Sequence, residues 1–417
     1  MPIPEGDPTR PQRRDADAWR SGLQPEMPRR SLLRLGVAGV AGYALQPSAL
    51  AQVSGSGDVV PDDRSLIVRS QRPLNLESSV ASLVDRLTPI DQFFVRSHFG
   101  APAVDLAPWE VEIVGLVDRP LRLSLHELGR MEQSARTAVL QCAGNGRGLY
   151  RPRVPGVPWE RGAVGQAEWA GVRLAELLER ARPHKDAAHV HFLGSDSPPT
   201  PRIAAFVRSI PLDRAHDPGT ILALRMNGEP LPTLHGGPAR LVVPGWAGNN
   251  WFKWVRQIVV ARDEAPGFYM QTAYRMPRTP VAPGAGQPAV PMDPVTWMNV
   301  KSLIALPGRG DVVAGRRAQI RGVAWTGQGH VTRVEVRVGP DEPWREATLL
   351  DEPDPGAWRC WRLEWEPARQ GRFAITARAT DSTGAVQPTT PAWNKSGYLW
   401  NGYDEVEIEV RGQEARQ

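Results

Sequence analysis

Residues 137–148 read TAVLQCAGNGRG and join a short apolar run to a glycine-rich loop. The run predicts a buried strand that ends directly at Cys142. Three glycines follow within six residues, and they let the backbone approach a bulky ligand and offer its amides to it. Arg147, five residues after the cysteine, could hold an anion beside the thiol. A strand that delivers one cysteine into such a loop indicates a binding site.

Cys142 has three functional interpretations and one structural one. A cysteine nucleophile needs a histidine base and an orienting group, and no known protease signature surrounds this cysteine. A zinc site needs further Cys or His residues at short spacing, and the loop has none. A single thiolate on a metal that takes its other ligands from a cofactor stays open. A free buried cysteine in a turn stays open as well.

The composition describes a soluble globular protein with more than one domain. The chain has 417 residues, of which 41% are hydrophobic and 23% are charged, and this length exceeds one ordinary core. Its 40 Gly and 41 Pro predict many turns and argue against a mainly helical fold. The formal net charge is +5, and no Lys/Arg run is interleaved with aromatic residues, so we expect no nucleic-acid partner.

The first 51 residues have the pattern of a targeting segment. Residues 28–36 read PRRSLLRLG, and a mildly apolar run then leads to ALA at 49–51. Paired arginines, a short apolar stretch and an A-x-A site are typical of a twin-arginine signal peptide. We therefore expect a signal peptide over 1–51 and a periplasmic protein with no membrane span after cleavage, since the apolar run is short and rich in Gly and Ala. An uncleaved amphipathic anchor is the alternative.

Residues 58–275 predict an α+β domain, because strand and helix patterns mix without regular alternation. Apolar residues at helical spacing predict a helix over 172–181. Strands are expected at 110–117, 137–141, 189–193, 221–224, 241–243 and 258–260.

The pattern changes after a segment rich in Pro, Gly and Ala at 276–294, which predicts a linker extended over the surface. Residues 295–412 then read as short alternating strands between turns. This spacing favours an all-β, immunoglobulin-like sandwich with a packing or dimerisation role. Strands are expected at 316–325, 331–338, 344–350, 358–365 and 373–380.

A second cluster of polar side chains lies at 93–98, which reads FFVRSH. In a strand, Arg96 and His98 would face the same side. A surface arginine and a hydrogen-bonded histidine would also explain this hexapeptide. Tyr274, just before the linker, would ordinarily be taken as a domain-interface residue.

A third cluster combines a tight turn with a tryptophan-rich strand. Residues 235–246 read HGGPARLVVPGW, and 251–254 read WFKW. Here His235, Arg240 and Lys253 could converge on one anionic group. A turn followed by a core strand is the simpler explanation of the same residues.

Together and in this order, these clusters resemble the sulfite oxidase family of molybdenum enzymes over roughly residues 58–405. The resemblance implies a molybdopterin-binding domain followed by a dimerisation domain. It implies Cys142 as the thiolate ligand of molybdenum, with the pyranopterin dithiolene and oxo groups as the other ligands. The implied cofactor contacts are Phe94, Arg96, Ser97, His98, Asp196, His235, Arg240, Trp251, Phe252 and Lys253. The implied anion pocket beside the metal consists of Arg96, Arg147, Trp159 and Tyr274.

The resemblance also implies the reaction, which is oxidation of sulfite to sulfate with electrons passed singly to an external c-type cytochrome. The chain has no Cys-x-x-Cys-His haem attachment site and no His-Pro-Gly-Gly core. We therefore expect no haem in this chain, and a likeness to the bacterial exported sulfite dehydrogenases. A homodimer through the second domain is a further expectation.

One segment departs from the family pattern. Animal and plant relatives have a Trp-Asn-Leu-Arg-Gly segment whose Arg reaches the pocket, whereas residues 393–397 read WNKSG here, with Ser396 at the Arg position. Lys395 is a point charge and cannot make the bidentate contact of a guanidinium. This difference leaves room for another oxyanion or sulfur substrate.

Three alternatives to sulfite oxidation stay open. The first is a related oxidoreductase that acts on a sulfane-sulfur carrier. The second is a periplasmic methionine sulfoxide reductase, against which residues 295–410 argue because that relative typically lacks the second domain. The third is a metal-free binding protein, which an elemental analysis for molybdenum would identify.

Overall fold

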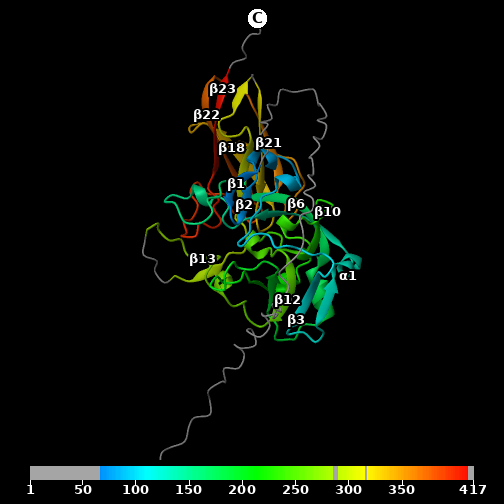
Figure 1. The fold of residues 1–417 in the computed structure, drawn as a ribbon. Coiled ribbons are helices and arrows are strands. Elements are labelled where there is room, and N and C mark those ends of the chain that lie inside the picture. Colours follow the sequence, from blue (N-terminus) through cyan, green and yellow to red (C-terminus); the bar gives the residue numbers. More distant parts are fainter. Residues whose placement is uncertain (1–65, 285–289, 315–316, 412–417) are drawn as a thin grey trace, which may run out of the picture. The chain divides into compact units, whose positions relative to one another are not determined.

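A computed structural model describes residues 66–284, 290–314 and 317–411 of the chain (Figure 1). The predicted signal peptide over 1–51 lies outside these residues. Within the described part of the chain, no helix is long and apolar enough to cross a membrane.

Two sheets build the first domain. One has the strand order β10-β9-β6-β5, with β11 paired to β9. Its strands are β5 (Ser134–Gln141), β6 (Val164–Arg173), β9 (Ile221–Met226), β10 (Glu229–Pro230) and β11 (Arg240–Val242). The other sheet has the order β4-β3-β12-β7-β8, in which β12 pairs with β3 in parallel and its other strand pairs are antiparallel. Its strands are β3 (Glu110–Gly115), β4 (Leu121–Ser124), β7 (His189–Gly194), β8 (Arg208–Pro211) and β12 (Val255–Ala261).

Short helices connect these strands. Helix α1 (Leu125–Arg130) begins with a capping box, in which the Ser124 hydroxyl accepts from the Glu127 amide and the Glu127 carboxylate accepts from the Ser124 amide. Helix α2 (Leu174–Ala181) buries one apolar face, as its helical spacing predicts. The remaining helical segments are α3 (Leu212–Ala215), α4 (Phe268–Gln271) and the 3-10 turns η1 (Val80–Leu83), η2 (Ile90–Gln92), η3 (Arg147–Leu149), η4 (Thr233–His235) and η5 (Gly248–Asn250).

The strands expected in the first domain are present as β3, β5, β7, β9, β11 and β12. The helix predicted over 172–181 starts at Leu174, because Val172 and Arg173 still belong to β6. Strand β6 itself was not predicted, since two glycines and the polar Gln166 and Glu168 interrupt its apolar pattern.

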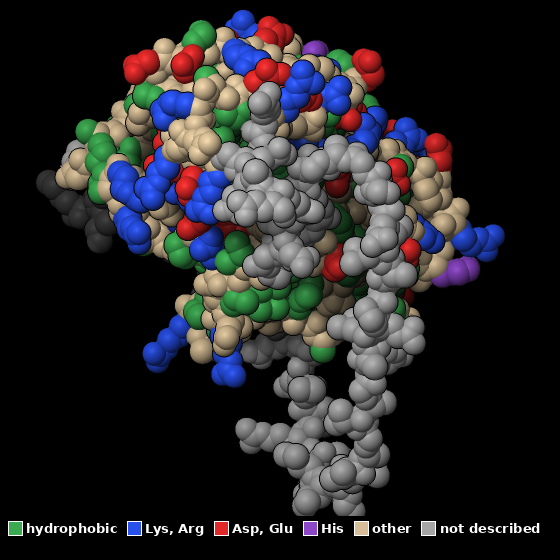
Figure 2. All heavy atoms as spheres, turned by 90° about the horizontal axis from the view of Figure 1, so that it is seen from above, with side chains coloured by type: hydrophobic (Ala, Val, Ile, Leu, Met, Phe, Trp, Pro, Cys, Tyr) green, Lys and Arg blue, Asp and Glu red, His purple; other side chains and the backbone are tan. Residues whose placement is uncertain are grey.

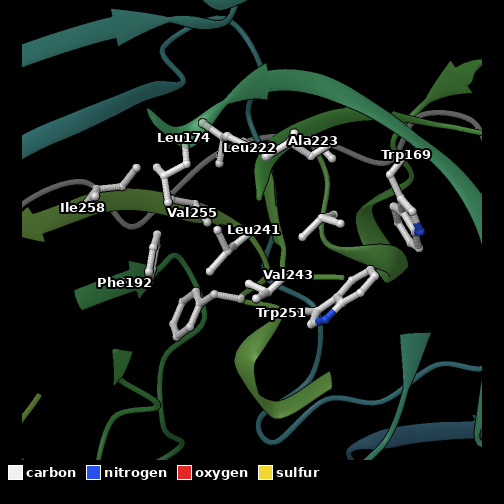
Figure 3. Close-up of a cluster of buried hydrophobic side chains, with 14 of the residues drawn as sticks. Trp169, Leu174, Phe192, Leu222, Ala223, Leu241, Val243, Trp251, Val255 and Ile258 are labelled. Carbon is white, nitrogen blue, oxygen red and sulfur yellow. The ribbon is translucent and has the colours of Figure 1, made fainter. Parts of the chain in front are cut away.

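The first core lies between these sheets and α2. Side chains from α2, β6, β7 and β12 point toward one another around Leu241 and Val243 (Figure 3). Trp169 and Trp251 meet edge to face, with ring centroids 5.6 Å apart. Both indoles are buried, and the Arg240 guanidinium lies over both rings. This edge of the core therefore borders the candidate site, which Arg240 and Trp251 both line.

The second domain consists of two facing sheets. One has the order β15-β17-β21-β20 and the other β16-β23-β22-β18-β19. Their strands are β15 (Lys301–Leu306), β16 (Val312–Ala314), β17 (Ala318–Trp325), β18 (Val331–Val338), β19 (Arg345–Glu346), β20 (Thr348–Leu349), β21 (Arg359–Trp365), β22 (Gly371–Asp381) and β23 (Asp404–Arg411). Apolar side chains of both sheets form one core, for example Ile304 and Trp361 with Val334 and Ile375.

This arrangement fits the expected all-β second domain, while the immunoglobulin-like description stays a prediction. The strand predicted over 344–350 is divided into β19 and β20, which pair into different sheets.

Acidic and basic side chains are interspersed over the face of the molecule in Figure 2, as on an ordinary solvated surface.

The predicted linker does not run as one extended connection. Its start, β13 (Arg275–Pro277), pairs antiparallel with its end, β14 (Met292–Pro294). Arg275 lies opposite Pro294, so the two ends of the segment lie side by side. Near the start of the described chain, β1 (Ile67–Gln71) and β2 (Leu74–Glu77) form a second small ladder.

Buried hydrogen bonds join the two domains around the Cys142 loop. The Trp325 indole N–H donates to Gln141 Oε1 over 2.7 Å, and the Leu399 amide donates to the Ala143 carbonyl over 2.8 Å. Gln141 and Ala143 flank Cys142 in the sequence. The second domain therefore holds the residues on both sides of the cysteine, Gln141 by its side chain and Ala143 by its backbone.

Replacing Gln141 with Leu should leave the buried Trp325 N–H without its acceptor, and should lower the free energy of unfolding by about 1–3 kcal/mol. Denaturant titration followed by tryptophan fluorescence measures this. Gln319→Leu is the control, because Gln319 makes a hydrogen bond of the same 2.7 Å length to Glu364 on an exposed face. That variant should change stability by less than about 0.5 kcal/mol. Equal losses in the two variants would contradict the prediction.

Candidate functional site

A pocket lies beside Cys142, and the space between its walls is about 690 Å³ when the solvent at its mouth is included. Segments far apart in the sequence form its walls, and most of the residues predicted to contact a cofactor are among them. The lining residues are Phe94, Arg96, Ser97, His98, Leu140, Cys142, Ala143, Asp196, Phe206, Leu234, His235, Arg240, Gly248, Asn249, Trp251, Phe252, Lys253, Trp254 and Tyr274.

Strand β5 and a tight loop hold Cys142 at the pocket wall. The Cys142 amide donates to the Ala163 carbonyl, and the Gly144 amide points at the Cys142 sulfur over 3.4 Å. Gly146 has a φ of +84°, and a Cβ there would lie 2.8 Å from the Trp400 side chain. Glycine is therefore required at 146 both by the turn and by the approach of the second domain. Cys142 and Cys360 are both free thiols.

Arg240 brings a buried positive charge to the pocket. Its Nη1 donates to the His235 carbonyl over 2.6 Å, and its guanidinium lies over the rings of Trp169 and Trp251. Its Nε has no hydrogen-bond partner within the described part of the protein. Burial lowers the pKa of Arg240 to about 9. A bound anion would supply both the missing acceptor and the missing counter-charge.

Lys253 is a second, half-buried cation at the same wall. Its Nζ donates to Ser97 Oγ over 3.1 Å and to the Leu234 carbonyl over 3.0 Å. Burial, followed by the nearby Arg240, lowers the pKa of Lys253 well below its usual range. Asp196 is the one carboxylate among the described lining residues, and burial raises its pKa to about 6. The pocket thus has more buried positive charge than its own carboxylate can balance.

Two histidines line the pocket in their neutral form at pH 7. Burial, then Arg240 and Lys253, lowers the pKa of His235 to about 4. Burial, then Arg96, lowers the pKa of His98 well below its usual range. A neutral imidazole can donate from one nitrogen and accept at the other, so these rings can orient a polar ligand without adding charge.

Tyr274 enters the pocket from a strained backbone position. Its φ is +54°, a conformation that for a bulky side chain costs about 1–3 kcal/mol and that clusters at functional sites. Its hydroxyl lies 2.8 Å from His98 Nε2. Burial raises the pKa of Tyr274 to about 12, so the phenol stays protonated and can donate a hydrogen bond.

Two predicted pocket residues lie behind the lining. Trp159 is fully buried and meets Phe94 edge to face at 6.5 Å, so it supports the wall through Phe94. Arg147 donates from Nε to the Ser396 carbonyl over 2.9 Å and from Nη1 to the Val157 carbonyl over 3.4 Å. It borders the Cys142 loop from the side of the second domain.

The structure answers two local questions that the sequence left open. Residues 96–98 do not form a strand; only Val95 makes a bridge, to Leu76, although Arg96 and His98 still both line the pocket. Lys395 does not replace the missing arginine at the pocket, because its side chain is exposed and lies outside the lining set.

Several lining residues were not predicted. Phe206 stacks on His98 at 4.3 Å and on Phe252 at 5.4 Å, but it is a lone aromatic after a Pro-rich stretch and carried no signal. Asn249 lines the pocket with a buried Oδ1 that no described group satisfies. The Gly-Asn-Asn run at 248–250 was a turn signal that could have pointed to Asn249.

The protein groups around Cys142 fit a metal only if a bound molecule brings further ligands. The described residues contain no group of three His, Cys, Asp or Glu side chains that could hold a metal ion. The unpaired Arg240 Nε and Asn249 Oδ1 and the surplus buried cations suit a polar ligand that carries a phosphate. These residues therefore fit a phosphate-bearing organic cofactor that presents a metal to the thiol.

Two family models match the chain. A model described as "Oxidoreductase molybdopterin binding domain" matches residues 98–269, and one described as "Mo-co oxidoreductase dimerisation domain" matches residues 293–411. The two matched ranges lie in the first and the second domain.

Known proteins resemble the chain over most of its length. It is 36% identical over 370 residues to mitochondrial sulfite oxidase of Mus musculus. This alignment covers 83% of this chain and 66% of the mouse protein, just under two thirds of its length. It is 32% identical over 381 residues to sulfite oxidase of Arabidopsis thaliana, covering 83% of this chain and 94% of that one. The solved sulfane dehydrogenase SoxCD of Paracoccus pantotrophus superposes with a TM-score of 0.71 at 26% identity, covering 85% of this chain and 92% of that chain.

The pKa of His235 predicts a pH dependence of stability for the cofactor-free protein. Between the unfolded value of 6.5 and the folded value of about 4, the unfolded chain binds more protons. Stability should therefore fall as the pH drops through this window, by about 2–3 kcal/mol from this residue alone. His235→Gln can keep the hydrogen bond to the Ile90 carbonyl and should avoid this loss.

Denaturant unfolding of parent and variant at a series of pH values measures the difference, which separates His235 from other titrating groups. Replacement of the exposed His216 by Gln is the control and should follow the parent profile. Parallel profiles for the parent and His235→Gln would rule out the assigned shift.

Proposed function

Because the chain belongs to the sulfite oxidase family of molybdopterin enzymes, we propose that it oxidises sulfite to sulfate. The observation that carries this proposal is the pocket, which joins one thiol to a cation-rich wall and to a protonated phenol. The names of the similar mouse and Arabidopsis proteins support sulfite as the substrate.

Separate walls of the pocket would hold the cofactor and the substrate. Arg240, Lys253 and Ser97 would bind the phosphate and polar edge of the pterin, and the Cys142 thiolate would bind molybdenum. When bound, the molybdenum centre supplies the oxygen atom transferred to sulfur and accepts two electrons. The protein has to hold the sulfite anion beside this centre and hold the proton of any group that hydrogen-bonds to the anion.

Arg96 and Tyr274 would hold sulfite, since both line the pocket beside Cys142. Arg96 is partly exposed in the pocket and offers charge-assisted hydrogen bonds to an oxyanion. The protonated Tyr274 hydroxyl can donate a hydrogen bond to sulfite while its oxygen accepts one from Nε2 of neutral His98, 2.8 Å away. The pKa of Tyr274 is raised and that of His98 is lowered, so the proton stays on the phenol and His98 orients the hydroxyl.

We propose further that the electrons pass singly to an external c-type cytochrome, and that the protein works in the periplasm after twin-arginine export. A homodimer through residues 293–411 is supported by the match of this segment to a dimerisation domain. The proposed cytochrome partner rests on the absence of a haem attachment motif from this sequence and on the expected export.

A sulfane-sulfur substrate is the second candidate. Ser396 stands where animal and plant relatives have a pocket arginine, and the solved structure similar to this chain at a TM-score of 0.71 is a sulfane dehydrogenase. A pocket with one fewer guanidinium would hold a small dianion less tightly and admit a larger substrate. Methionine sulfoxide reduction and a metal-free binding role have less support, because the chain contains the second domain and the pocket fits the cofactor.

Cys142→Ser, prepared with its full pterin content, should lower sulfite oxidation by at least about 100-fold, because a direct metal ligand is lost. Molybdenum analysis and a sulfite assay with ferricyanide or cytochrome c measure this. Cys360→Ala removes the other thiol, which is buried in the second domain, and should keep the parent rate. Sulfite oxidation at the parent rate by pterin-loaded Cys142→Ser would refute the assignment.

The same assay separates the substrate classes. Parent protein that contains molybdenum but oxidises a sulfane-sulfur carrier in preference to sulfite would favour the second candidate. Reduction of methionine sulfoxide with reduced benzyl viologen would indicate the reverse reaction, and a parent without molybdenum would indicate a binding protein.

Changing Arg29 and Arg30 together to Lys should leave most of the protein in the cytoplasmic fraction, because twin-arginine export requires the paired arginines. Cell fractionation with immunoblotting measures the distribution. Arg34→Lys changes a neighbouring arginine outside the pair and should not alter export. Unchanged periplasmic accumulation of the double variant would argue against this route.

A further inference from the structure

Tyr398 is a second-domain residue that touches the first-domain site. Its ring stacks on Tyr274, with centroids 5.2 Å apart and an interplanar angle of 19°. Its hydroxyl accepts a hydrogen bond from the Tyr274 amide over 3.2 Å. Tyr398 is buried but does not line the pocket, so it acts on a ligand only through its neighbours.

The hydroxyl of Tyr398 is the hydrogen-bond acceptor for the buried amide of Tyr274. The left-handed backbone at Tyr274 leaves its buried amide facing the second domain, and this amide requires an acceptor. Arg208 lies over the Tyr274 ring at 5.5 Å, so an arginine and a second tyrosine both hold that ring. Without Tyr398 the strained backbone of Tyr274 would lose a hydrogen bond and an aromatic contact together.

The same segment holds Arg147. The Arg147 guanidinium carbon lies 5.5 Å from the centre of the Tyr398 ring, and Nε donates to the Ser396 carbonyl. A Cβ added at Gly144 would lie only 2.6 Å from Arg147 Nη2, so the guanidinium rests against the Cys142 loop. Nη2 makes no hydrogen bond within the described structure and remains available to an anion.

Tyr398 is itself rigidly placed. Its amide donates to Asn394 Oδ1 over 2.9 Å, and its carbonyl accepts from Asn394 Nδ2 and from the Tyr150 hydroxyl, each over 2.9 Å. The next residue, Leu399, is hydrogen-bonded to Ala143 in the Cys142 loop. A side chain held this firmly can determine the position of the groups packed on it.

We propose that Tyr398 is a positioning residue that fixes Tyr274 and Arg147 around the substrate oxyanion. The second domain then acts on the pocket from behind its lining, through a stacked tyrosine and the Ser396 carbonyl, where animal and plant relatives have a guanidinium. This role rests on the proposed function, since it assumes that an oxyanion binds beside Cys142.

Tyr398→Leu, Tyr398→Phe and a control, Tyr403→Leu, test the role in the cofactor-loaded protein. Tyr403 is a half-buried second-domain tyrosine whose ring packs on Trp344, and it does not touch the site. Molybdenum content and thermal unfolding are measured first. The KM and kcat for sulfite are then measured across pH, and the Kd for inorganic sulfate is measured by calorimetry.

Tyr398→Leu removes both the stacking and the acceptor, and should raise the KM for sulfite and the Kd for sulfate about tenfold. Tyr398→Phe keeps the ring and should raise them about threefold, which is the rescue expected of a conservative variant. Tyr403→Leu should leave both within about twofold. In an Arg147→Ala background, Tyr398→Leu should raise the sulfate Kd by a smaller factor than in the parent, because one of its targets is already absent.

A sulfate Kd and a sulfite KM within about twofold of the parent in Tyr398→Leu, at parental molybdenum content, would overturn the proposal. If the Leu variant does not fold, Tyr398→Phe decides alone, and parental values there overturn it as well. A parent that binds sulfate but does not oxidise sulfite refutes the proposed function, whereas the sulfate comparison still decides the role of Tyr398. A parent that binds no sulfate refutes the positioning role, because no oxyanion is then held.

Discussion

Positive charge buried without an equal number of carboxylates is the constraint on which the site depends. Arg240 is buried in the Trp-rich core and Lys253 is half-buried beside it, while Asp196 is the one acid among the described residues that line their pocket. A bound anion would stabilise such an arrangement. The binding site for such a ligand is formed by the two sheets of the first domain, the tight turn before β11 and the tryptophans around that turn.

Much of this site was predictable, because its chemistry is concentrated in short local segments. The Cys142 loop, the turn from His235 to Arg240 and Lys253 each combine an unusual residue type with backbone signals that a single sequence displays. Arg147 was predicted to line the pocket, but its Nε is held by the Ser396 carbonyl, a contact between residues 249 positions apart. Phe206 and β6 escaped prediction for a similar reason, since packing against distant residues decides their place.

The second domain is more than a dimerisation module attached to an enzyme. Its Trp325 and Leu399 bind the residues that flank Cys142, and its Trp400 requires glycine at 146. The Cys142 loop is therefore held in place by both domains. This explains how a change in the segment around Ser396 can alter the pocket without any change in the residues that hold the cofactor.

The pairing of β13 with β14 has a consequence for how the chain tolerates change. Tyr274 immediately precedes β13, and its carbonyl accepts a hydrogen bond from Val295, the residue just after β14. The chain thus enters the second domain through this antiparallel strand pair, and the residues between Pro277 and Met292 connect its two strands. Their number does not affect the geometry of the site, because lengthening a loop adds little to the entropy cost of closing it. This connection offers a point at which a fused tag or a whole inserted domain would leave Tyr274 in place.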